Sequence, residues 1–238
     1  MIEEHLNLFD MIRFPKVRER KRILKNSKIT QIRFEIIEDR NIFPIINPKY
    51  SSLVSFNNYI NSCIIQYIEL YGYYKDGLPE YIPKKVTEKL IRKVLFNQTA
   101  EIFFMKINVC FELICQGINE IFELGINCNS RTFIGDLSKK LKTDNIRIFK
   151  IISELNIDKD YEKIRLYRNK LTHSFSPFFP SARTEINKDG IHIEKREASI
   201  PTTEILEEVE KSIELLYDFR IKIEDEIKIY YKDKNSVF

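Results

Sequence analysis

The sequence has little net charge, few histidines and cysteines, and no long uninterrupted hydrophobic run. Lys and Arg together number 39 against 35 Asp and Glu, an excess of only four in 238 residues. A balance this even produces no single-sign field over the molecule, so the overall charge does not indicate a nucleic-acid-binding protein. Any basic surface must therefore be local.

The four cysteines show no C-x-x-C spacing, and the three histidines lie far from them along the chain. Structural zinc sites usually bring such ligands together at short spacings, so the sequence predicts no metal site and no cofactor. We interpret the cysteines as reduced thiols of the core. They are Cys63, Cys110, Cys115 and Cys128.

Two further absences concern the cellular location. The N-terminus carries Glu3, Glu4, His5 and Asp10, whereas a secretory signal needs a positive start followed by an apolar stretch. The most apolar region, residues 100–124, is interrupted by charged and polar side chains, which argues against a bilayer-spanning helix. We expect a cytoplasmic protein that makes no use of a membrane.

The hydrophobic fraction of 43%, with 12% aromatic residues, is enough for one sizeable core. Apolar residues recur at three- and four-residue steps along most of the chain, which predicts amphipathic helices. These are expected near residues 53–71, 86–94, 102–122, 133–141, 146–155 and 161–173, and from 201 onward. We interpret residues 49–238 as one all-α helical bundle, preceded by an N-terminal appendage over residues 1–48.

Two segments alternate between apolar and polar residues instead. Residues 29–36 predict an extended segment or a short strand. Alternation on both sides of Asn187-Lys188-Asp189-Gly190 predicts a small β-hairpin over residues 183–200, inserted before the last long helix.

Residues 167–173 place an arginine, an amide and a histidine close together near a predicted helix end. Pro177 and Pro180 disfavour helical geometry before them, so this helix should end soon after His173. Arginine presents a permanently charged fork that fits phosphate oxygens, and histidine is the side chain suited to proton exchange near neutral pH. These groups are sufficient to cleave a phosphodiester without a metal.

Helical geometry constrains how the three side chains cooperate. Asn169 and His173 are four positions apart and share a face, which suits an amide that orients an imidazole. Arg168 and His173 are five positions apart and about 140° around the helix. Either the long arginine stem bridges this gap, or two copies of the helix meet across a dimer axis.

A structural interpretation of the same residues stays open. A histidine at a helix end often compensates the local dipole. An arginine beside the apolar stripe of a helix often pairs with a nearby carboxylate, here Asp160 or Glu162.

The segment resembles the Arg-x4-6-His signature of the HEPN superfamily, in its Arg-Asn-x-x-x-His form. Those proteins are helical bundles, and many are metal-independent endoribonucleases that act as toxins or antiviral effectors. The resemblance rests on this motif and on the helix pattern from about residue 53 to residue 230. It implies that Arg168 and His173 form a catalytic pair and that Asn169 positions them.

The resemblance also implies a reaction and partners. His173, or its copy in a homodimer, would take the proton of an RNA 2′-hydroxyl, and Arg168 would stabilise the charge that grows on the phosphate. RNA is the implied substrate, and an antitoxin is an implied partner. The alternative is a non-catalytic HEPN-fold module that binds RNA or protein, and a more remote alternative is a purely structural helical protein.

Three other groups are weaker candidates. A basic run over residues 16–25 could guide RNA, although it is better interpreted as a solvated helix face. The tyrosines near residue 71 could stack on bases but more often fill a core. Glu112, Gln116 and Asn119 form a polar stripe that could contact Arg168 or His173. Equally, Glu112 could be a buried carboxylate paired with a lysine or an arginine.

Overall fold

The computed structural model describes residues 17–25, 27–34, 51–83, 85, 87–130, 132–174, 176–186 and 192–235. These residues form an all-α helical bundle with one small β-hairpin, which confirms the predicted fold class. The elements in chain order are α2 (Val17–Leu24), η1 (Lys28–Gln31), α3 (Ser51–Lys75), α4 (Glu88–Ile121), α5 (Phe133–Asp144), α6 (Ile146–Ile157), α7 (Lys159–His173), β1 (Ser181–Ile186), β2 (His192–Glu197) and α8 (Thr202–Asn235).

The chain divides into two compact units that interleave along the sequence. Unit 1 contains residues 1–26, 65–105 and 166–210, and unit 2 contains residues 27–64, 106–165 and 211–238. The long helices α3, α4, α7 and α8 contribute residues to both units. None of the described helices is long and apolar enough to cross a membrane.

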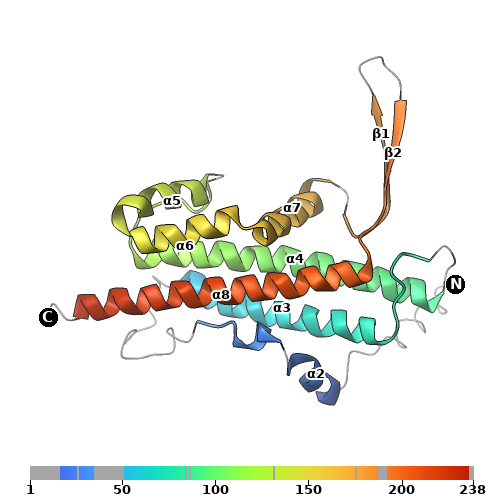
Figure 1. Cartoon of the computed structure of the whole chain (residues 1–238), viewed down its shortest axis with the longest axis horizontal. Helices are drawn as coiled ribbons and strands as arrows, with labels where there is room; N and C mark the ends of the chain where they lie inside the picture. The colour runs from blue at the N-terminus through green and yellow to red at the C-terminus, as the bar shows by residue number, and fades with distance from the viewer. Residues whose placement is uncertain are drawn as a thin grey trace. The chain divides into compact units, whose positions relative to one another are not determined.

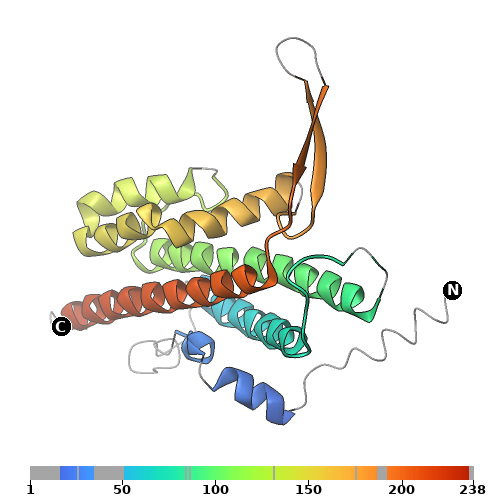
Figure 2. The same ribbon diagram turned by 45° about the vertical axis from the view of Figure 1, so that its right-hand side comes forward.

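Aromatic packing marks the core of unit 2. The ring of Phe111 in α4 lies 5.0 Å from that of Tyr161 and 5.8 Å from that of Phe219, measured between centroids. Beside this core, α5 and α6 lie side by side (Figure 2). Asn145 begins α6, because its side-chain Oδ1 accepts a hydrogen bond from the backbone N–H of Ile148 at 3.1 Å.

Unit 1 contains the hairpin and the beginning of α8. Strands β1 and β2 pair antiparallel with Ser181 opposite Glu197 and Ile186 opposite His192 (Figure 1). The paired strands confirm the predicted hairpin, whereas its predicted turn residues 187–190 lie outside the described residues. Within the same unit, Tyr67 donates a hydrogen bond to the carboxylate of Glu210 at 2.7 Å, and Tyr71 donates to the same oxygen.

Two predicted elements were wrong. The alternation at residues 29–36 does not form a strand over its described part, because residues 28–31 form the 3-10 helix η1 with Ile29 and Ile32 buried. Ser27 starts this turn by accepting a hydrogen bond from Ile29 N–H at 3.2 Å. The separate helices near 86–94 and 102–122 are one helix, α4, because no glycine or proline interrupts residues 94–102.

Candidate active site on α7

The helix that carries the motif has defined ends. Asp158 caps its start, because Oδ1 accepts hydrogen bonds from the backbone N–H groups of Asp160 at 2.9 Å and Tyr161 at 3.0 Å. The helix ends at His173, as the downstream prolines predict. The hydroxyl of Thr172 donates back to the carbonyl of Arg168 at 2.9 Å and to that of Asn169 at 3.2 Å.

A buried aromatic cluster holds this part of α7 in unit 1. Tyr167 is 4% exposed and Phe178 is fully buried. The ring of Tyr167 lies 4.8 Å from Phe104 and 5.4 Å from Phe178, and the rings of Phe104 and Phe178 stack at 5.5 Å. The residue just before Arg168 is therefore fixed in the core, which limits how far the helix end can shift.

The three motif side chains are accessible to solvent. Arg168 is half-buried, whereas Asn169 and His173 are exposed. Nη1 of Arg168 donates a hydrogen bond to Oδ1 of Asn169 at 3.2 Å. Neither the cationic group nor the imidazole is sealed in the interior, so both can meet an anionic ligand.

The structure joins Arg168 to Asn169 and leaves His173 apart from them. No hydrogen bond between Asn169 and His173 occurs among the described residues, and the amide oxygen instead accepts from the neighbouring guanidinium. Arg168 makes no ion pair with any described carboxylate. The ion pair with Asp160 or Glu162 that the structural interpretation predicts is therefore not found among the described residues.

Most of the chain matches one known protein family. A family model described as Cthe2314-like HEPN matches residues 41–235. The chain belongs to this HEPN family. Neither a curated protein nor a solved structure matches the chain at a significant level.

In this HEPN protein the polar stripe on α4 has partners within unit 2. Glu112 accepts a hydrogen bond from Asn108 at 2.8 Å. Asn119 closes the turn after α4, because its amide donates to the carbonyl of Ile126 and accepts from its N–H, both at 3.0 Å. These contacts give the stripe a structural role.

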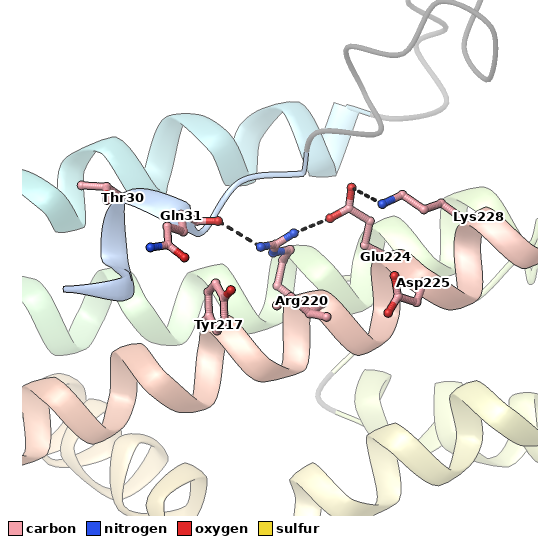
Figure 3. Close-up of a pocket in the computed structure, with 8 residues that line it drawn as sticks. Thr30, Gln31, Tyr217, Arg220, Glu224, Asp225 and Lys228 are labelled. Atoms are coloured by element: carbon pink, nitrogen blue, oxygen red, sulfur yellow. Dashed lines mark hydrogen bonds and ion pairs between the residues drawn. The ribbon is translucent and has the colours of Figure 1, made fainter. Parts of the chain in front are cut away.

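Unit 2 of the HEPN chain also contains an open pocket of about 400 Å³. Figure 3 shows Arg220 between the carbonyl of Gln31 and the carboxylate of Glu224. Lys228 pairs with the other oxygen of Glu224 at 3.5 Å. The lining residues are Thr30, Gln31, Tyr217, Arg220, Ile221, Glu224, Asp225 and Lys228.

The charges of this pocket argue against phosphate binding. Its two cations, Arg220 and Lys228, are balanced by Glu224 and Asp225. The side chain of Glu224 is 3% exposed and forms ion pairs with both Arg220 and Lys228. The carboxylate therefore offsets the positive charge of these two residues within the pocket. The arrangement ties η1 to α8 and does not form a second anion site.

Sequence reasoning missed two buried polar residues of unit 1, Lys93 and Asn97. Nζ of Lys93 donates a hydrogen bond to Oγ1 of Thr202 at 2.6 Å and lies 5.1 Å from the centre of the Phe96 ring. The available signal was their four-residue spacing on a helix whose neighbouring positions, such as Phe96 and Ala100, are apolar. Among the described residues, no cluster of three or more His, Cys, Asp or Glu side chains is placed to hold a metal ion.

Proposed function

We propose that this HEPN protein is a metal-independent endoribonuclease in which Arg168 and His173 are the catalytic pair and Asn169 is their polar partner. The observation that carries the proposal is that neither group is buried in α7, since His173 is exposed and Arg168 is half-buried, in a chain of the HEPN family. The absence of an ion pair between Arg168 and any described carboxylate supports it, because the guanidinium charge stays available to a phosphate.

The proposed reaction is transesterification of RNA. His173 takes the proton of the 2′-hydroxyl, the 2′-oxygen forms a bond to phosphorus, and the bond to the 5′-oxygen breaks. The leaving 5′-oxygen takes up a proton from water and becomes a hydroxyl. Arg168 stabilises the negative charge on the phosphoryl oxygens as this occurs. The products carry a 2′,3′-cyclic phosphate and a 5′-hydroxyl, and single-stranded RNA is the preferred substrate because its backbone can bend into a cleft.

A homodimer is part of the proposal. Within one copy, ideal helix geometry separates residues 168 and 173 by about 140° and by about 7.5 Å along the axis. Two copies that meet near the ends of α7 would bring the arginine of one protomer close to the histidine of its partner. HEPN domains commonly dimerise, which agrees with this geometry.

The experiment uses purified protein, mixed single-stranded RNA and an excess of chelator. Wild-type protein is expected to cleave RNA, and Arg168→Ala and His173→Ala are each expected to lose about 100-fold or more in rate. Arg165→Ala is the matched control, because it removes an exposed arginine from the same helix. Equal cleavage by all four proteins would indicate a contaminating nuclease and would contradict the proposal.

The biological role proposed with this activity is that of a cytoplasmic toxin or antiviral effector, restrained by an antitoxin. Expression of the wild-type protein is expected to arrest growth, and Arg168→Ala and His173→Ala are expected to relieve the arrest. Growth at the normal rate with full-length protein present would contradict a toxin role and leave the cleavage assay to decide the chemistry.

A second candidate is a HEPN-fold module that binds RNA without cleaving it. The observation that favours it is the bond from Arg168 to Asn169, which leaves the arginine beside a residue other than His173. Binding without cleavage would appear as a gel shift of intact RNA, weakened by Arg168→Ala and by added salt. Intact RNA in the chelator assay together with such a shift would favour this module.

A further inference from the structure

The turn that follows His173 is anchored by buried groups of unit 1. Phe178, in this turn, is fully buried, and its carbonyl accepts a hydrogen bond from Nδ2 of Asn97 in α4. The neighbouring carbonyl of Pro177 accepts from the N–H of Ile200 at 3.2 Å. The turn is therefore held from α4 on one side and from the segment before α8 on the other.

Asn97 has an unusual environment for an amide. Its side chain is fully buried, and its Oδ1 has no hydrogen-bond partner among the described residues. A buried acceptor without a partner destabilises the folded state, so an apolar residue of similar size would suit this position better for packing alone. An apolar residue cannot replace the amide Nδ2, which donates a hydrogen bond to the carbonyl of Phe178.

Buried residues flank the motif on both sides in the sequence. Tyr167 precedes Arg168 directly, and Phe178 follows His173 by five residues. The rings of Tyr167 and Phe178 both pack on Phe104 of α4. Arg168 and His173 thus lie on a stretch whose two ends are fixed to the same helix.

We infer that Asn97 is a positioning residue for the site formed by Arg168 and His173. It touches neither side chain. By holding the carbonyl of Phe178, it fixes the turn at residues 176–179, close after His173 along the chain, and so sets the direction in which the end of α7 presents the imidazole. The catalytic part of this inference rests on the proposed function, whereas the anchoring of the turn can be measured without any activity.

Two variants remove the donor in different ways. Asn97→Leu keeps a similar volume, removes the donor and also removes the unpartnered acceptor, so it is expected to fold. Asn97→Asp keeps the shape and replaces the donor with a carboxylate that repels the carbonyl of Phe178; it is the second variant if leucine prevents folding. Gln98→Leu is the matched control, because it removes an exposed amide at the next position of the same helix.

The first measurement is amide hydrogen exchange followed by mass spectrometry. Asn97→Leu is expected to exchange faster than wild type in residues 174–180, with unchanged exchange in the rest of α4. Gln98→Leu is expected to match wild type throughout. Unchanged exchange of residues 174–180 in Asn97→Leu would overturn the inference.

The second measurement is RNA cleavage under saturating and limiting substrate. Asn97→Leu is expected to lower kcat about 10- to 100-fold while KM changes by less than about threefold, because a displaced catalytic group slows the chemical step more than it weakens RNA binding. A folded Asn97→Leu protein with wild-type kcat would overturn the inference. If wild-type protein cleaves no RNA, the proposed function fails, and the exchange measurement alone decides whether Asn97 anchors the turn.

Discussion

Lys93 shows, at the scale of a single residue, how a buried charge couples stability to pH. Its side chain is fully buried, and no described carboxylate forms an ion pair with it. Burial lowers the pKa of Lys93 to about 8, and the negative charge of Glu80 acts in the opposite direction. The ammonium instead donates to Thr202 at the start of α8.

The lowered pKa predicts a rise in stability at alkaline pH. Above about pH 8 the folded protein has lost the Lys93 proton, whereas the unfolded chain keeps it up to its ordinary value of 10.5. Unfolding takes up a proton in this window, so this group raises the free energy of unfolding by at most about 1.4 kcal/mol per pH unit. Below pH 8 both states are protonated and the contribution is constant.

Lys93→Met isolates this effect from the other groups that titrate in the same window. Urea unfolding at pH 7, 8, 9 and 9.5 is expected to show a smaller rise in stability for the variant than for wild type. Parallel pH dependences for the two proteins would show that the folded and unfolded states bind the Lys93 proton equally.

At the scale of the element, α7 depends on one cap. The carboxylate of Asp158 accepts two backbone N–H groups, from Asp160 and Tyr161. Asp158→Ala is expected to lower the free energy of unfolding by about 1–2 kcal/mol, and Asp158→Asn is expected to recover most of the loss. Chemical denaturation of the three proteins measures this, and an alanine variant as stable as wild type would contradict the assigned cap.

Close packing of α3 against α4 in unit 2 depends on Gly117. A Cβ at this position would lie 2.5 Å from Cδ2 and 2.8 Å from Cγ of Leu53, which is fully buried. Gly117→Ala is expected to destabilise the protein by about 1–3 kcal/mol through this clash, although alanine gains about 1 kcal/mol in helix propensity.

A double-mutant cycle tests the contact directly. Once Leu53→Ala has removed the obstructing atoms, Gly117→Ala is expected to become neutral or stabilising. Additive effects of the two substitutions would show that Leu53 does not limit the space beside Gly117.

The sequence predicted the helices of this fold better than their boundaries. Strong apolar periodicity located α3 and α8, and the prolines after His173 located the end of α7. The length of α4 was misjudged, because two apolar patterns that were assigned to separate helices belong to one helix over Glu88–Ile121. The 3-10 helix η1 was missed, since its alternating apolar residues match a strand equally well.

For the candidate site, the sequence proposed residues but could not predict their contacts, and the roles of these residues stay a prediction. The motif named Arg168, Asn169 and His173, and the structure leaves Asn169 and His173 exposed and Arg168 half-buried. The bond from Arg168 to Asn169 depends on side-chain conformations that spacing does not fix. The anchoring by Asn97 joins residues 81 positions apart, a contact that no local pattern carries.

At the scale of the whole molecule, the proposed dimer makes a prediction about mixed variants. If the arginine and the histidine of one active site come from different protomers, Arg168→Ala and His173→Ala proteins should complement each other. Mixing equal amounts of the two inactive proteins, with time for protomer exchange, is expected to restore about a quarter of the wild-type rate, since about half of the dimers are then mixed and each mixed dimer contains one intact site of two.

Co-expression with two different tags provides mixed dimers if protomers exchange slowly. As a control, each variant is mixed with wild-type protein, which measures how much the rate falls when inactive protomers dilute the active ones. A mixed dimer without activity, beside active wild type, would place both catalytic groups in one protomer.

The division into an appendage over residues 1–48 and a bundle over residues 49–238 also stays a prediction at this scale.

The chemistry of the cleaved RNA ends tests directly whether Arg168 and His173 catalyse transesterification. RNA cut by the wild-type protein in the presence of chelator is analysed by mass spectrometry, beside the Arg168→Ala and His173→Ala proteins. Wild-type protein alone is expected to yield fragments with a 2′,3′-cyclic phosphate and a 5′-hydroxyl. Fragments with a 5′-phosphate, or cyclic ends produced equally by both variants, would contradict it.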